Sequence, residues 1–307
     1  MTDHDRLFKE LIGRFFVDFL DLFLPEVRAF VEADSIQFLD KEIFTDVTSG
    51  ERMEPDLIAR VRFRGLPTYF IIHIENQSQA QKGFGRRLFR YFSRIHDQHN
   101  LPVYPIVIFS FDSPRRPQPD FYRVEFPNKV VLDFRFDVVQ LNRLSWRDFV
   151  KKKNPVAAAL MAKMNIAQGE RARVKLECLR LLLTLKLNKA RMKLISGFID
   201  NYLDLNREES KEFEAEVREL AVKEKEHVME IMTSWKKEGL RQGLAQGRVE
   251  AVRGAVVDIL EARFNRVPAA VKRALKAVED QKQLKLLLRQ AATVDSIKEF
   301  EIQLTSL

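Results

Sequence analysis

Two acidic residues stand at matching ends of a predicted β-hairpin: Asp56 begins its first strand and Glu75 ends its second. The hairpin turns at "RGLP" (64–67), and each acid lies eight residues from that turn. Both carboxylates are therefore expected at the open end of the hairpin, within reach of one metal ion. Gln77 follows Glu75 by two residues, so the alternation of side chains along a strand puts it on the same face.

Carboxylates and amides in this arrangement are hard oxygen ligands. They suit Mg²⁺, which takes one or two carboxylates together with waters and substrate phosphate. Such an ion polarises a phosphodiester and lowers the pKa of an attacking water. The plain alternative is that Asp56 is a strand-start acid and Glu75 an exposed strand end, both of which are common. His73, between Ile72 and Ile74, is expected to be a half-buried histidine with satisfied hydrogen bonds rather than a ligand.

The elements around the hairpin describe an α/β domain. Apolar residues at helical spacing predict a helix from residue 5 that Pro25 ends, and another over residues 81–99. The continuous apolar run "YFIIHI" is typical of a central strand. Further strands are predicted in "SIQFLDKEIF", in "VYPIVIFSF" and, as one or two strands, in "FYRVEFPNKVVLDFRFDVVQL". This order of elements favours an α/β domain that ends near residue 145.

The composition changes after residue 150, where strand-forming windows disappear and Leu, Ala, Lys, Arg and Glu dominate. We therefore predict an all-helical C-terminal region, and divide the chain into an α/β domain (1–148), a basic and charged helical region (149–234) and a last helical region (235–307). Residues 151–193 hold twelve Lys or Arg and two Glu. A solvated helix face or a surface for nucleic-acid phosphates would explain this imbalance.

A stripe of small residues follows one tryptophan. Trp235, Gly239, Gly243 and Gly247 recur every four residues, which aligns them along one side of a helix. Each glycine costs about 1 kcal/mol relative to alanine in a helix. The pattern indicates either a homo-oligomer formed through the C-terminal helices or a flexible joint between two helical parts.

Composition limits the kind of protein. The formal net charge of +8 and the pI near 9.5 favour a polyanionic partner over an acidic substrate. Cys178 is the one cysteine, so no internal disulfide can form, and it is expected to fill apolar space on a helix. The opening "MTDHDRLFKE" lacks the positive region of a signal peptide, and the apolar stretches are too short and too charged to span a bilayer. We expect a soluble, cytoplasmic protein with no membrane partner.

Two longer motifs carry a resemblance to a known group of nucleases. "EPDLIARV" followed by "FIIHIENQSQ" resembles the PD-(D/E)XK nuclease superfamily, in which Pro-Asp begins one strand and acid-X-Lys ends the next. "HDRLFKELI", "IENQS" and "GRRLFRYFSRI" are similar to the Rpn-type, transposase-like branch of recombination-promoting nucleases, over about residues 3–145. The segment "WKKEGLRQGLAQGR" is also similar to C-terminal stretches of that branch. The resemblance implies a restriction-endonuclease-like core, with a mixed central sheet flanked by helices, and cleavage of DNA phosphodiesters with Mg²⁺ or Mn²⁺.

Carried over residue by residue, the resemblance makes Asp56 and Glu75 metal ligands, with the carbonyl of Asn76 completing the shell. Gln77 stands where the superfamily has lysine; a glutamine can orient water or phosphate but brings no charge. An outer carboxylate is expected at Glu10, on the first helix. The basic residues expected at DNA phosphate are Lys9, Arg86, Arg87 and Arg90.

The sequence supports two hypotheses. In the first, the protein is a metal-dependent DNA endonuclease whose catalytic residues are Asp56, Glu75, Gln77 and Glu10. In the second, it is a catalytically inactive protein of the same fold that acts by DNA binding or oligomerisation. The missing lysine favours the second hypothesis, and the intact Pro-Asp and Glu-X-Gln favour the first. Carboxylates of Asp56 and Glu75 on opposite faces of the sheet would exclude the enzyme.

Overall fold

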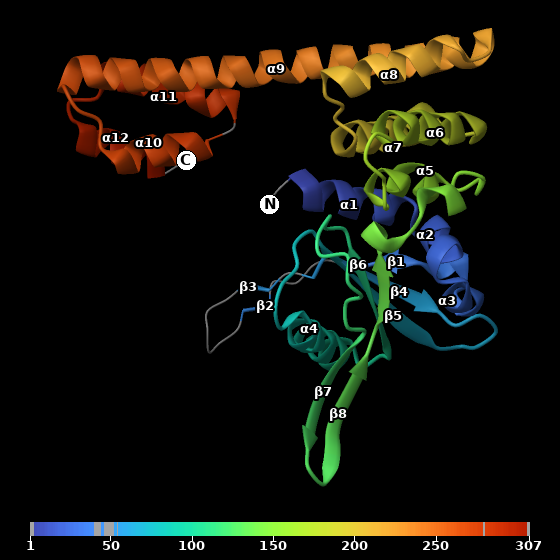
Figure 1. Cartoon of the computed structure of the whole chain (residues 1–307). Helices are drawn as coiled ribbons and strands as arrows, with labels where there is room; N and C mark the ends of the chain where they lie inside the picture. The colour runs from blue at the N-terminus through green and yellow to red at the C-terminus, as the bar shows by residue number, and fades with distance from the viewer. Residues whose placement is uncertain (1–2, 40–43, 46–51, 54, 279, 306–307) are drawn as a thin grey trace. The chain divides into compact units, whose positions relative to one another are not determined.

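A mixed β-sheet lies at the centre of the N-terminal part of the chain. The computed structural model describes residues 3–39, 44–45, 52–53, 55–278 and 280–305 (Figure 1). Among these residues, five strands form the sheet in the order β1-β4-β5-β6-β9, antiparallel from β1 to β5 and parallel from β5 to β9. Their bounds are β1 (Gln37–Phe38), β4 (Leu57–Arg62), β5 (Tyr69–Gln77), β6 (Val103–Phe109) and β9 (Asp137–Gln140). The predicted α/β class with a mixed sheet is confirmed.

Strand β5 is the central strand, and all of its residues but the first are buried. The apolar run that forms it is covered on both faces, which is why it lacks the alternation of a surface strand. Its antiparallel register with β4 pairs Leu57 with Ile74, so Asp56 comes opposite Glu75. The turn spans residues 63–68, in agreement with the predicted hairpin.

Residues 3–30 contain three helices: α1 (Asp3–Arg14), α2 (Phe16–Phe23) and α3 (Pro25–Phe30). The prediction of one helix from residue 5 to Pro25 is wrong. The backbone of Phe15 leaves helical geometry, with φ −123° and ψ 39°, and this break allows Phe15 and Phe16 both to be buried. Pro25 does not only follow the end of α2; it begins α3, at a position where its missing N–H costs nothing.

The predicted helix over residues 81–99 is confirmed as α4 (Phe84–His99), which buries one side on the sheet through Phe84, Leu88, Tyr91 and Ile95. Strands β7 (Phe121–Phe126) and β8 (Lys129–Arg135) form a separate antiparallel hairpin that extends past α4 (Figure 1). The segment from Phe121 to Leu141 therefore holds three strands rather than one or two. A Cβ at Gly85 would lie 3.2 Å from the main-chain oxygen of Phe121, so glycine permits the close approach of α4 to β7.

The expected first strand "SIQFLDKEIF" pairs with β4 only over Gln37–Phe38. Its residues 40–43 lie outside the described part of the chain. Further along, β2 (Phe44–Thr45) pairs with β3 (Arg52–Met53) in a short antiparallel ladder. The short 3₁₀ turn η1 (Ala33–Ser35) precedes β1.

Helices after the sheet pack with it in one compact unit, Met1–Met229. Asn154 caps α5 (Pro155–Leu160) and also donates from Nδ2 to the main-chain oxygen of Asp18 on α2 (2.8 Å).

Cys178 is buried on α6 (Arg171–Thr184), as expected of an apolar filler, and burial raises the pKa of its thiol. The elements are η2 (Leu141–Arg143), η3 (Trp146–Asp148), α5 (Pro155–Leu160), η4 (Met161–Lys163), α6 (Arg171–Thr184), α7 (Lys189–Tyr202), α8 (Arg207–Arg218) and the start of α9 (Val222–Phe264). The three-region division drawn from composition stays a prediction.

The second compact unit, Glu230–Leu307, is helical, as predicted. It contains the rest of α9 together with α10 (Ala269–Ala277), α11 (Gln281–Thr293) and α12 (Ile297–Thr305). Its core includes Leu260, Leu284 and Phe300, each fully buried. Within the residues described, none of the helices combines the length and apolarity that a membrane span requires.

The glycine stripe lies inside α9, whose 43 residues form one helix. The side-chain surroundings of Trp235, Gly239 and Gly243 lie outside the described part of the chain. A Cβ added at Gly247 would meet no described atom within 4 Å. Self-association through this stripe stays a prediction.

Candidate active site

Asp56 and Glu75 meet at the open end of the hairpin formed by β4 and β5. The main-chain N–H of Asp56 donates to Oε1 of Glu75 (2.9 Å), and the N–H of Asn76 donates to Oδ2 of Asp56 (2.8 Å). Each carboxylate is therefore held by the backbone of the other strand. Both line one hollow of about 340 Å³, which we call the acidic pocket. They lie on the same side, as the symmetric hairpin predicts; their role as metal ligands stays a prediction.

Helix α1, the segment after β5 and helix α4 complete the acidic pocket. Its charged lining consists of three carboxylates and one guanidinium, which gives it a negative balance. Amide residues, the hydroxyl of Ser78 and one phenol supply the remaining polar groups. The lining from these elements includes Asp5, Asn76, Gln77, Gln81, Arg87 and Tyr91.

Lys9 is the cation closest to the acid pair, with Nζ 2.8 Å from Oδ1 of Asp56. Burial raises the pKa of Asp56 to about 6 and the charge of Glu75 adds to the rise, while the hydrogen bond from Lys9 opposes it. The negative charge of Asp56 is thus only partly compensated by Lys9. A further positive charge in the pocket would favour the ionised form of Asp56.

His73 forms a hydrogen bond with the carboxylate of Glu75. Its Nε2 lies 2.9 Å from Oε1 of Glu75 and must donate, because a carboxylate only accepts. The ring packs edge-on against Tyr91, with centroids 5.8 Å apart. The expectation of a half-buried, satisfied histidine is wrong on both counts. The side chain is fully buried, and Nδ1 has no hydrogen-bond partner among the described residues.

Asn76 and Gln77 are buried at the end of β5. The Gln77 amide donates from Nε2 to the main-chain oxygen of Asn76 (3.1 Å), so the carbonyl expected to complete a metal shell already accepts one hydrogen bond. The side-chain amide of Asn76 is different: neither of its polar atoms has a partner in the described part of the chain. An unpaired buried polar group costs about 1–3 kcal/mol, so its persistence here calls for a ligand or a water.

The donor set fits a hard divalent cation. It consists of the carboxylates of Asp56 and Glu75, with Asn76 beside them in the lining of the pocket. Oxygen ligands of this kind suit Mg²⁺ or Mn²⁺. No group of three or more His, Cys, Asp or Glu able to hold a metal occurs among the described residues. A site that takes two carboxylates and completes its shell with waters and substrate phosphate is compatible with that finding.

The structure does not bring Glu10 to the acidic pocket. Its side chain is exposed, whereas Asp5 from the same helix lines the pocket. Asp5 and Lys9 are four residues apart and so lie on one side of α1, while Glu10 lies about 100° further round. Sequence reasoning missed Asp5, although its spacing from Lys9 in "HDRLFKELI" was a usable signal.

The four basic residues predicted to contact DNA phosphate lie at different places in the structure. Lys9 reaches the acid pair, and Arg87 lines the acidic pocket, where it donates to Gln81. Arg86 lines a second hollow that shares Gln77 and Gln81 with the acidic pocket. Arg90 lines neither hollow.

His4 connects the end of β5 to the helices that follow the sheet. Its Nδ1 lies 2.5 Å from the hydroxyl of Tyr202 on α7, and its Nε2 lies 3.2 Å from Oγ of Ser110. Ser110 in turn donates its main-chain N–H to the carbonyl of Gln77 (2.9 Å). Burial lowers the pKa of His4, which favours the neutral ring that can accept from one side and donate to the other. This chain of bonds fixes the strand end that carries Gln77.

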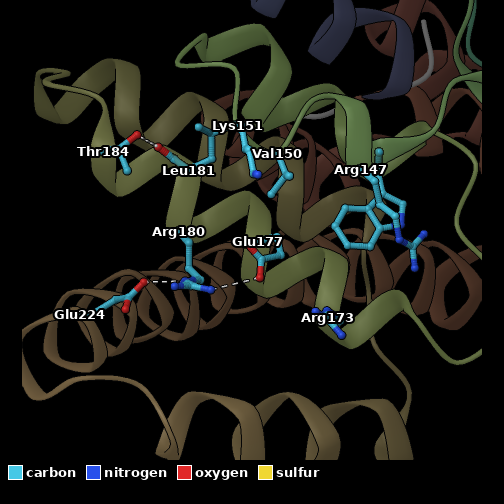
Figure 2. A pocket seen from close by; sticks show the side chains of 10 residues that line it. Arg147, Val150, Lys151, Arg173, Glu177, Arg180, Leu181, Thr184 and Glu224 are labelled. Carbon is cyan, nitrogen blue, oxygen red and sulfur yellow. Dashed lines mark hydrogen bonds and ion pairs between the residues drawn. The ribbon is translucent and has the colours of Figure 1, made fainter.

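The basic stretch 151–193 contributes to a separate groove of about 460 Å³ beside α6 (Figure 2). Arg180 lies in it between two acids, with Nε 2.7 Å from Glu224 and Nη1 3.1 Å from Glu177. Arg147 also lines the groove and is paired with Glu170. Ion pairs within the protein therefore neutralise part of the positive charge around this groove. Binding of nucleic-acid phosphates by residues 151–193 stays a prediction.

The fold and the site together define an α/β protein whose central hairpin ends in a pocket with paired carboxylates. Residues 2–193 match the family described as "Putative transposase, YhgA-like", and the chain belongs to that family. The resemblance to the transposase-like branch is thereby confirmed. No curated protein and no solved structure shows a significant match to the chain.

Proposed function

We propose that this protein is a metal-dependent DNA endonuclease of the PD-(D/E)XK type that breaks DNA during recombination. The observation that carries the proposal is the exchange of hydrogen bonds between Asp56 and the β5 end, which puts two carboxylates in one pocket. Membership of a transposase-like family supports DNA as the substrate.

In this proposal Asp56 and Glu75, with Asn76 beside them, hold Mg²⁺ or Mn²⁺. The ion, when bound, would polarise the phosphodiester and lower the pKa of an attacking water. Gln77 orients the water or the phosphate by hydrogen bonds. His73 keeps Glu75 in place through the bond from Nε2.

Lys9 supplies the positive charge that Gln77 lacks. Its ammonium already lies 2.8 Å from Asp56, on the helix that also brings Asp5 to the pocket. A cation held next to the scissile phosphate stabilises the charge that develops there. Arg87, which lines the acidic pocket, provides a second such group.

A second candidate function is a catalytically inactive nuclease fold that acts by DNA binding or oligomerisation. The observation that favours it is Gln77 in the position of the lysine, together with the ion pair that Lys9 makes with Asp56. In that case the ammonium of Lys9 permanently takes the place of a metal ion. The function would then lie in the basic stretch 151–193 and the C-terminal helices.

Plasmid nicking separates the two functions. Purified protein is incubated with supercoiled plasmid in Mg²⁺, Mn²⁺ or EDTA, beside Asp56→Ala, Glu75→Ala and the control Glu10→Ala. We expect metal-dependent nicking that the first two substitutions abolish and the third retains, because Glu10 is exposed outside the pocket. Equal inertness of all four proteins, with a retained shift of DNA on a gel, would favour the inactive fold.

A further inference from the structure

A second hollow opens directly beside the acidic pocket. It measures about 630 Å³, within the range of about 300–1,000 Å³ typical of small-molecule sites. It shares Gln77 and Gln81 with the acidic pocket, so the two hollows are neighbours at the end of β5. We call it the cationic pocket.

The charge of this pocket is opposite to that of its neighbour. Lys82, Arg86 and Arg116 line it, all three exposed, and no Asp or Glu lines it in the described part of the chain. None of the three forms an ion pair with the residues that the structure describes. Free cations beside a pocket of carboxylates suit a phosphodiester chain that passes through both.

Aromatic rings and a helix end complete the pocket. Phe121 lines it with 43% of its surface exposed, and Tyr122 lies beside it. The guanidinium groups of Arg135 and Arg123 lie 5.3 Å and 5.9 Å from the centre of the Phe121 ring, which puts positive charge beside a ring of the kind that stacks on nucleobases. The first turn of α4 also lines the pocket. Its N-cap, Gly83, has no side chain to cap the helix, so main-chain N–H groups are left for an anion.

The loop that carries Arg116 is held in place without any ligand. Buried Gln140 donates from Nε2 to the main-chain oxygen of Arg116 (3.0 Å). Buried Asn142 donates from Nδ2 to the main-chain oxygens of Pro114 (3.0 Å) and Asp112 (3.2 Å). A preorganised loop loses little entropy when it binds.

We infer that the cationic pocket holds an unpaired nucleotide of the DNA strand, next to the phosphodiester at the acidic pocket. The inference rests on the proposed function and names its substrate class: single-stranded or locally unpaired DNA. A base inside a duplex is stacked on its neighbours and cannot offer its face to Phe121. Lys82, Arg86 and Arg116 hold the adjoining phosphates.

Binding of the 12-mer dT₁₂, labelled with fluorescein, tests the inference in EDTA, where no cleavage occurs. Fluorescence anisotropy is measured for the full-length protein, for Phe121→Ala and for Arg116→Ala. The chain offers matched controls: Phe126→Ala, exposed on the same strand but outside the pocket, and Arg115→Ala, the exposed neighbour of Arg116.

We expect Phe121→Ala to weaken binding about 5- to 100-fold, and the effect to disappear on an abasic 12-mer. Arg116→Ala should weaken binding and reduce the slope of log affinity against log salt by about 0.7. Both controls should bind as the wild type does, and a 12-base-pair duplex should bind more weakly than dT₁₂. Equal effects of Phe121→Ala and Phe126→Ala, or no preference for dT₁₂ over the duplex, would overturn the inference.

The outcome is separate from that of the nicking experiment. If the plasmid is nicked but Phe121→Ala and Arg116→Ala bind dT₁₂ like the wild type, the nucleotide pocket is wrong and the nuclease stands. If no metal supports nicking but the two variants lose binding as expected, the pocket stands and the nuclease is wrong.

Discussion

The acidic pocket and the cationic pocket lie side by side and are built from opposite chemistry. The first gathers Asp5, Asp56 and Glu75, and burial raises the pKa of Asp56 to about 6. The second gathers three exposed cations and, among the described residues, no carboxylate. Gln77, a neutral amide, lines both.

This difference gives each pocket a separate task. Buried carboxylates repel phosphate unless a cation is added, so under the proposed function the acidic pocket accepts DNA only after it binds a metal. The cationic pocket attracts phosphate directly. Substitutions in one pocket should therefore change metal binding, and substitutions in the other should change DNA binding alone.

The largest effect is expected for Lys9, the cation paired with Asp56. Lys9→Met should lower plasmid nicking about 100-fold or more, because it removes the charge that Gln77 cannot supply. Adding Gln77→Lys in the same protein should restore part of the rate, since it returns a lysine to the end of β5. Nicking rates in Mn²⁺ measure both, with the exposed Arg14→Met on the same helix as the control. A Lys9→Met protein that nicks at the wild-type rate would show that Lys9 has no role in the reaction.

The next largest effect is expected for loss of the hydrogen bond between His73 and Glu75. His73→Phe should weaken Mn²⁺ binding about 10- to 100-fold, as residues that orient a ligand commonly do. His73→Gln keeps an N–H donor and should lose less. The exposed His96→Phe on α4 is the control, and thermal denaturation establishes that each variant is folded. Equal Mn²⁺ affinity in His73→Phe and wild type would exclude a positioning role.

A smaller effect, confined to the cationic pocket, is expected at the loop that carries Arg116. Asn142→Ala leaves the carbonyls of Asp112 and Pro114 without their donor, which should cost about 1–3 kcal/mol of unfolding free energy. Urea denaturation measures that loss. Binding of dT₁₂ should weaken while Mn²⁺ affinity stays unchanged. A change in Mn²⁺ affinity instead would mean that the two pockets are not independent.

The smallest effect concerns the pH dependence of stability without metal. Folding raises the pKa of Asp56 from 3.8 to about 6, so the folded protein binds its proton more firmly than the unfolded chain does. This group therefore lowers the free energy of unfolding as pH rises through that window, and the penalty is complete above it. Asp56→Asn removes the penalty. Its Tm relative to wild type should be a few degrees higher at pH 8 than at pH 5; an equal difference at both pH values would contradict the assignment.

Local patterns were sufficient to predict the hairpin and its acid pair. The spacing of Asp56 and Glu75 about the turn determines their register, because an antiparallel hairpin pairs residues that are equally far from its turn. The apolar run of β5 likewise predicts a strand buried on both faces. These features depend on neighbours in the chain, so periodicity and turn chemistry reveal them.

Features that depend on distant segments were not predictable in the same way. The cationic pocket needs α4, β7 and the loop of Arg116 to come together, and no pattern within one segment encodes that meeting. The bond from Asn154 to Asp18, which ties the later helices to the first ones, joins residues 136 positions apart. Asp5 is intermediate, since its helical spacing from Lys9 was visible in the sequence.

Calorimetric titration of Mn²⁺ into the wild type, Asp56→Asn and Glu75→Gln at pH 7.5 tests the central claim most directly. Both substitutions preserve the shape of the side chain and remove one charge from the acidic pocket. We predict that the wild type binds Mn²⁺ and that each variant binds it at least about 10-fold more weakly, because Mg²⁺-type sites depend on one or two carboxylates. Absence of binding to the wild type, or equal binding to all three proteins, would contradict the metal site and with it the proposed nuclease.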